Sequence, residues 1–115
     1  MQMDEMIQDF VERVNEKSFI TPILPTYPII CTIKTFNQVD VKLQFAKEGI
    51  SIVEANVNGD VLIAGEEENI TDLLKGVIPL SDPNIKFKGT YRHFLLLESI
   101  FVMAKHKSTN INIVS

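Results

Sequence analysis

The segment from Tyr91 to Lys105 most constrains the fold of this chain, because it predicts a helix that is apolar over about half of its circumference. Its broad apolar face carries Phe94, Leu96, Leu97, Ile100, Phe101, Met103 and Ala104. Leu95 and Val102 add a second, smaller apolar patch. An ordinary surface helix buries a stripe of only about 100°. This helix is therefore expected to be covered on two sides, to contact a partner, or to face an apolar ligand in a cavity.

Two further segments predict amphipathic helices. The first spans about residues 4–16 and repeats apolar side chains at spacings of three and four: Met3, Ile7, Phe10 and Val14. The second spans about residues 66–75, with acidic residues at its start and Gly76 just past its end. Its inward stripe is predicted to contain Ile70, Leu73, Leu74 and Val77. Both helices therefore have one face to bury.

Five strands are predicted, over residues 29–36, 39–46, 50–56, 60–64 and 85–88. In the second strand, Val39, Val41, Leu43 and Phe45 alternate with more polar residues, which is typical of a sheet with one buried face. Short connections between the first three strands predict antiparallel hairpins. Three prolines exclude a helix or central strand from residues 19–28, so this apolar segment is expected to be a packed loop. Together these elements predict a single α+β domain over residues 1–115.

The sequence contains no recognisable catalytic or metal-binding constellation. A zinc site needs three or four convergent ligands, whereas this chain has His93, His106 and a single thiol, Cys31. Cys31 alternates with Ile29 and Ile33, which favours a buried, unreactive thiol over a nucleophile. The glutamates at 66–68 point in different directions around a helix and do not converge on a cation. We therefore expect no enzymatic activity, no metal and no cofactor.

Charge and hydropathy limit the partners that can be expected. The formal net charge is −4 and the eleven Lys and Arg residues are scattered, so nucleic acid is not predicted as a partner. No apolar run reaches the ~20 residues that span a bilayer, so no stable membrane insertion is expected. The first residues lack the basic and apolar regions of a signal peptide, and one cysteine offers no disulfide. These features predict a cytoplasmic protein.

From about Val39 to Lys105 the order of elements resembles the sterol-carrier-protein lipid-transfer domain. The resemblance rests on the strand DVLIAG at 60–65, the acidic residues 66–68, Leu73-Leu74 with Gly76, and the strand IKFKG at 85–89. That family shows a similar succession of a strand ending near a small residue, an acidic leucine-bearing helix closed by glycine, and a lysine-containing strand. The resemblance implies a twisted, five-stranded, mostly antiparallel sheet with helices over one face. It also implies an apolar tunnel between the two layers for sterols, fatty acids or acyl chains.

The resemblance implies non-catalytic binding or transfer of an apolar ligand inside this tunnel. The ligand-binding residues that it suggests lie on the last helix, the middle helix and the sheet: Phe94, Leu97 and Phe101; Leu73, Leu74 and Val77; and Leu43 and Phe45. The candidates for holding a ligand carboxylate are Lys86, Lys88 and Arg92.

Two alternatives stay open at the level of the sequence. The apolar last helix can pack on a protein partner or on a second copy of the chain, forming a homodimer, because exposed apolar patches usually mark such surfaces. The chain can also be an accessory domain that keeps a carrier-like fold with its cavity filled. The large apolar residues that line a cavity are the same types that fill a core.

Overall fold

A computed structural model of the protein describes residues 3–105. The helices of this part of the chain are α1 (Met3–Glu16), the short 3-10 helix η1 (Thr21–Ile23), α2 (Glu67–Lys75) and α3 (Tyr91–Met103). The strands are β1 (Ile29–Thr35), β2 (Val41–Ala46), β3 (Gly49–Val53), β4 (Val61–Gly65) and β5 (Lys86–Lys88).

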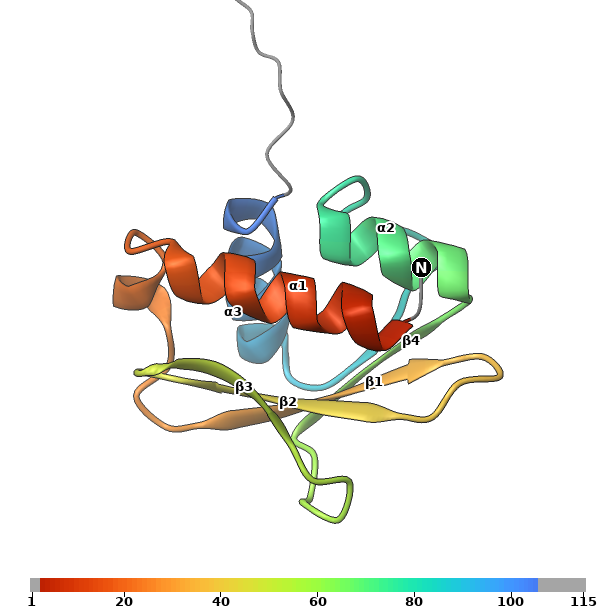
Figure 1. Ribbon diagram of the computed structural model, residues 1–115, viewed down its shortest axis with the longest axis horizontal. Coiled ribbons are helices and arrows are strands. Elements are labelled where there is room, and N and C mark those ends of the chain that lie inside the picture. The colour runs from red at the N-terminus through yellow and green to blue at the C-terminus, as the bar shows by residue number, and fades with distance from the viewer. Residues whose placement is uncertain (1–2, 106–115) are drawn as a thin grey trace, which may run out of the picture.

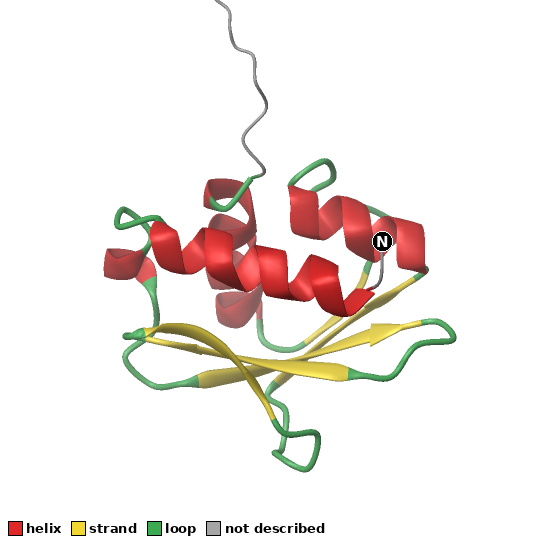
Figure 2. Cartoon of the chain, viewed as in Figure 1, coloured by secondary structure: helices red, strands yellow, loops and turns green. Residues whose placement is uncertain are grey.

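The strands form one five-stranded sheet in the order β3-β2-β1-β4-β5. β1 and β4 run parallel, and the other neighbouring pairs are antiparallel. All three α-helices lie on the same side of this sheet, with α1 crossing in front of α3 (Figures 1 and 2). These observations confirm the predicted α+β class, with a mostly antiparallel sheet covered by helices on one face.

The parallel pair arises because the segment from β3 to β4 crosses the helix-free face of the sheet, where it forms the loop below the strands in Figure 1. Gly59 lies so close to β1 that a Cβ there would be 2.6 Å from the Thr32 Oγ1 atom. The Asp60 carboxylate then accepts a hydrogen bond of 2.8 Å from the Ile30 amide. The connection is therefore held directly against the central strand.

Strand register directs a continuous apolar surface toward the helices. Leu43 of β2 lies opposite Cys31 on one side and Ile52 on the other, and Phe45 lies between Ile29 and Ile50 in the same way. Because side chains alternate between the two faces of a strand, these residues share the helix-covered face. The buried strand residues and the inner faces of the helices form one hydrophobic core.

Two predicted strand boundaries were wrong. β2 begins at Val41 rather than Val39, which is 83% exposed. The Gln38 amide donates to the Thr35 carbonyl, and Asn37 has a positive φ of 62°, so residues 36–40 form a turn instead of an extended strand. β3 ends at Val53, where the chain leaves the sheet edge for the crossing segment.

The proline-containing segment packs against the body of the protein as predicted. Ile20 and Leu24 are buried, whereas Phe19 is largely exposed. The 3-10 helix η1 includes Pro22 in its first turn, a position where the missing amide hydrogen costs little. This segment carries the chain from the end of α1 to the start of β1.

Candidate functional site

Most of the predicted ligand-binding residues lie in the apolar layer between the sheet and the helices. Three elements contribute them: Leu43 and Phe45 from β2, Leu73 and Leu74 from α2, and Leu97 and Phe101 from α3. Each of these side chains is at most 3% exposed. The fold therefore brings together residues from distant parts of the sequence in one buried, apolar layer.

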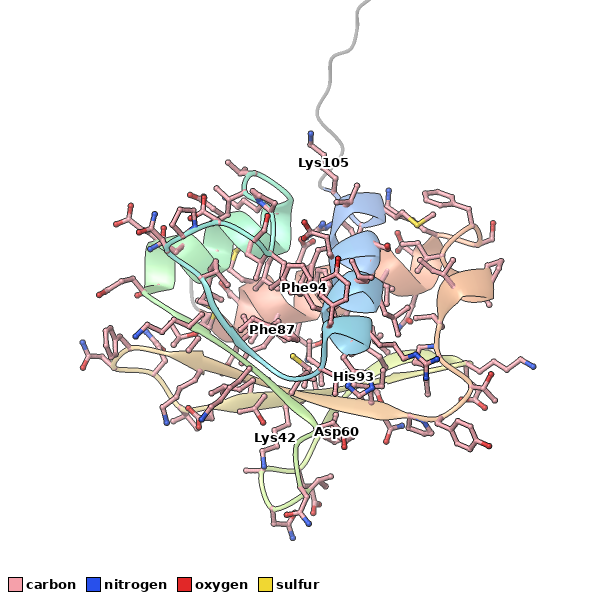
Figure 3. All side chains as sticks on the ribbon, turned by 180° about the vertical axis from the view of Figure 1, so that it is seen from behind. Lys42, Asp60, Phe87, His93, Phe94 and Lys105 are labelled. Atoms are coloured by element: carbon pink, nitrogen blue, oxygen red, sulfur yellow. The ribbon has the colours of Figure 1, made fainter. Side chains whose placement is uncertain are left out.

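Phe94 lies at the margin of this layer. It is half-buried and packs edge-on against Phe87 of β5, with 5.2 Å between ring centroids (Figure 3). Tyr91, one turn earlier on α3, also stacks on Phe94, with 6.4 Å between ring centroids. Phe94 therefore links α3 to β5 at this margin.

Val77 does not face the interior, and the prediction that it belongs to the inward stripe was wrong. α2 ends at Lys75, and Gly76 adopts a left-handed conformation with φ of 80°. Such a residue stops the helical repeat and redirects the chain. Val77 is consequently 66% exposed, although it still borders a surface cleft described below.

The first helix covers the layer and contacts α3 through aromatic rings. Phe10 of α1 is fully buried and stacks on Phe101 of α3, with centroids 5.1 Å apart and planes inclined by 26°. Met3 and Met6 also point from α1 into the core. The sequence predicted the apolar face of this helix but offered no signal for its partner.

A cleft opens where α2 and α3 end, and we call it the α2–α3 cleft. It is lined by residues 76–79 and by Phe101, Val102 and Lys105, and its volume is about 180 Å³. Two predicted ligand-binding residues, Val77 and Phe101, meet here from opposite sides. The sequence did not predict their proximity, because it depends on how the ends of two helices are placed.

A second, larger cleft of about 570 Å³ lies at the ends of β1 and β4. On its floor, Ala64 lies between Lys34 and Lys86 on neighbouring strands. Lys34 pairs with Asp40 at 3.7 Å. None of the predicted ligand-binding residues lines this cleft, which is formed largely by loops that carry no periodic signal in the sequence.

Arg13 joins the three helices. Its Nη2 atom donates to the Leu74 carbonyl of α2 at 2.7 Å, and its Nη1 atom donates to the carbonyl of Ala104 just past α3. Its Nε atom is 3.2 Å from the Asp9 carboxylate, one turn earlier on α1. The positive charge lies at the carbonyl ends of two helices, where the helix dipole favours a cation. The sequence suggested only a solvent-facing residue, because spacing places Arg13 on the polar side of its helix.

Two other polar residues position α3. The Glu98 carboxylate accepts a hydrogen bond of 2.7 Å from the Leu80 amide, which attaches the α2–β5 connection to the middle of this helix. Thr90 caps the first turn, since its hydroxyl accepts a bond from the His93 amide. The contact with Leu80 gives the acidic Glu98 a structural role on this mainly apolar helix.

Known structures provide a comparison for this geometry. No protein-family model matches the sequence, and no curated protein matches it. Among solved structures, a UbiJ-SCP2 ubiquinone synthesis protein aligns with a TM-score of 0.60 at 8% identity, covering 82% of this chain and 87% of that one. Palmitated SCP2L2 from Aedes aegypti aligns with a TM-score of 0.60 at 15% identity, covering 88% and 95%. The sterol carrier protein domain 2 of Helicoverpa armigera also scores 0.60, at 14% identity, covering 94% and 91%.

The chain has the fold of the sterol carrier proteins. The predicted resemblance is thereby confirmed at the level of architecture. The resemblance implied an apolar ligand tunnel between the sheet and the helices. The buried layer described above occupies that position in the fold.

Two of the three predicted carboxylate partners do not lie beside the layer between the sheet and the helices. Phe87 faces the helices opposite Ile63, so its neighbours Lys86 and Lys88 project from the other face of the sheet. Arg92 is exposed at the start of α3. The prediction that these cations lie near the layer was wrong for the two lysines, because strand alternation turns them away from it.

The predicted thiol and histidine candidates form no metal cluster among residues 3–105. Cys31 is fully buried, and burial raises the pKa of its thiol to about 12. No three metal-ligating side chains of this part of the chain converge on one point. His93 is half-buried (Figure 3), and His106 lies outside the described residues. No helix in the described range is long and apolar enough to cross a bilayer.

Proposed function

We propose that this protein binds or transfers an apolar ligand, such as a fatty acid, an acyl chain or a sterol-like lipid, in a cavity between its sheet and its helices. The observation that carries the proposal is the sterol carrier fold, in which three helices cover a single face of the sheet. One structural neighbour is described as palmitated, which makes a C16 fatty acid a natural first ligand to test.

The composition of the layer supports this proposal. The residues that would contact the ligand are aliphatic or aromatic, and methionines at 3, 6 and 103 border them. Methionine side chains are unbranched and flexible, so they can change rotamer to admit a ligand at little cost. Each acyl methylene that is buried would contribute about 0.8 kcal/mol to the free energy of binding. This contribution opposes the loss of packing energy when the layer opens to admit the ligand.

The proposed role is non-catalytic and cytoplasmic. Cys31 is the only cysteine of the chain, and a thiol whose pKa is raised by burial is a poor nucleophile. A single cysteine with no partner for a disulfide suits a reducing compartment.

Two measurements on the purified protein test the proposal. Organic extraction followed by mass spectrometry is expected to recover a co-purified lipid, and added palmitate is expected to raise the melting temperature. Leu97→Trp, which fills the layer from α3, should abolish the palmitate-dependent shift while the folded far-UV spectrum is kept. The proposal fails if no lipid is recovered and neither palmitate nor cholesterol changes the melting temperature.

A protein-interaction role is a second candidate, favoured by the outer side of α3. Tyr91, Leu95 and Val102 are 74%, 47% and 59% exposed, and their spacing places them on one stripe of this helix. An exposed apolar stripe can hold a partner protein or a second copy of the chain. Light scattering at micromolar concentration tests self-association, which Leu95→Asp should then abolish.

A further inference from the structure

The α2–α3 cleft has apolar walls that come from two different elements. Val77 follows α2 and is 66% exposed, and Val102 lies near the end of α3 and is 59% exposed. Gly76 allows these two parts of the chain to meet, because a Cβ at this position would lie 2.8 Å from the Lys105 Cα atom. The cleft is therefore part of the close contact between the end of α3 and the segment that follows α2.

One residue of the cleft also belongs to the apolar layer. Phe101 lines the cleft, yet it is only 3% exposed and its ring stacks on Phe10 in the core. The same aromatic side chain thus borders both the surface opening and the buried layer.

Among the residues that the structure describes, a single cation lines the α2–α3 cleft. Lys105 is exposed at the end of α3 (Figure 3), and its ammonium forms no ion pair with the residues from 3 to 105. The lysines of β5 project from the opposite face of the sheet and cannot serve this opening. The charge and the apolar walls together match a molecule with an anionic head and an apolar chain.

Arg13 ties the two sides of this cleft together. It bonds to the carbonyl of Leu74, two residues before the cleft begins, and to that of Ala104, which precedes Lys105. A volume of about 180 Å³ is below the ~300 Å³ at which small-molecule sites begin, so this cleft is too small to hold a whole lipid. It is large enough for the part of a chain that passes from solvent into the layer.

We infer that the α2–α3 cleft is the entrance to the proposed lipid site and that Lys105 holds the anionic head group of a single-chain lipid there. The carboxylate lies at Lys105, and the chain passes between Val77 and Val102. The Phe101 ring turns aside to admit it, and Arg13 limits how far the two walls separate. This inference rests on the proposed lipid-binding function.

The path of the chain is tested with the full-length protein and a fluorescent stearate analogue in stopped-flow experiments. Val102→Asp places a charge on the wall of the cleft, and Leu95→Asp is the matched control on the same exposed stripe of α3. Val102→Asp is expected to slow association by about tenfold or more, since the chain must pass a charged group. Leu95→Asp should associate like the wild type. Equal rates for the two variants would exclude this path.

The head group is tested by titration with palmitate and with hexadecanol, which has the same chain without the charge. Lys105→Met is expected to weaken palmitate binding about two- to fivefold, as for an exposed ion pair, and to leave hexadecanol binding unchanged. Lys88→Met, on the opposite face of the sheet, is the control. Equal palmitate affinity in both variants would overturn the role of Lys105. If the wild type binds neither compound, the lipid-binding function itself fails, and this inference fails with it.

Discussion

Asn15 of α1 binds both backbone groups of Ile50 on the edge strand β3, with its Nδ2 atom 2.9 Å from the Ile50 carbonyl and its Oδ1 atom 2.9 Å from the Ile50 amide. A side-chain amide thereby takes the place of a sixth strand at that point of the edge. Edge strands expose unpaired amide and carbonyl groups that invite association with other chains. The helix therefore both covers the sheet and protects part of its edge.

We expect Asn15→Ala to lower the free energy of unfolding by about 1 kcal/mol, because it removes two hydrogen bonds at a partly exposed site. Urea unfolding followed by circular dichroism measures this change. Glu16→Ala, at the neighbouring position on the exposed side of α1, should change stability by less than about 0.5 kcal/mol. Similar losses in the two variants would mean that the contact with Ile50 contributes nothing specific.

Arg13→Met is expected to lower the free energy of unfolding by about 2–4 kcal/mol. It removes charge-assisted hydrogen bonds to two helix-terminal carbonyls and leaves those carbonyls without their partner in a partly buried place. Arg13→Lys should recover only part of this loss, since an ammonium lacks the forked geometry of a guanidinium. The same urea titration gives both values. Arg92→Met, at an exposed position, is the control and should leave the midpoint unchanged.

Gly76→Ala should destabilise the protein by at least about 1 kcal/mol. Its φ of 80° is unfavourable for a residue with a Cβ, and that atom would also approach the backbone of Lys105. Thermal unfolding is measured for this variant and for Lys75→Ala, one residue earlier on α2. Comparing the two separates the effect at Gly76 from a change in helix propensity. A Gly76→Ala protein as stable as its control would show that the contact between the end of α3 and the segment after α2 is not tight.

Cys31 predicts a specific dependence of stability on alkaline pH. Its pKa is raised from 9.0 to about 12 by burial, so above pH 9 the unfolded chain loses this proton while the folded protein keeps it. Stability then falls with rising pH between about 9 and 12, with a slope of up to about 1.4 kcal/mol per pH unit from this group. Denaturant midpoints measured across this range should fall less steeply for Cys31→Ala than for the wild type. Parallel curves would mean that the folded thiol ionises near its ordinary pKa.

Periodicity in the sequence predicted the elements that bury one face. The alternation of Leu43 and Phe45 predicted β2, and the spacing of Ile7, Phe10 and Val14 predicted α1. Gly76 was correctly expected to end α2, because a left-handed residue is the usual terminator of a helix. Boundaries at Val39 and Val77 failed because local turns, rather than side-chain hydrophobicity, decide where a strand or helix stops.

The candidate site was predicted only in part, for a related reason. Hydrophobicity identifies residues such as Leu97 and Phe101 as buried, but it does not distinguish a packed core from the wall of a cavity. The roles of Arg13, Asn15 and Glu98 carried no sequence signal, since a polar residue in a helix is usually solvent-exposed. Their partners are backbone groups of other elements, far away along the chain.

The apolar last helix is the most distinctive feature of the sequence. By itself it determined that α3 has too much apolar surface for an ordinary surface helix, so that this surface must be covered by the fold, by a partner or by a ligand. The tertiary structure decided how this is achieved: Leu97, Ile100 and Phe101 enter the core, while Leu95 and Val102 stay exposed. It also decided that the end of this helix meets the end of α2, where Arg13 donates hydrogen bonds to the carbonyls of Leu74 and Ala104. Local patterns determine which side chains must leave water, because burial depends on each residue's own hydrophobicity. Which surfaces then meet depends on strand register and on contacts between elements distant in sequence, and these exist only in the folded chain.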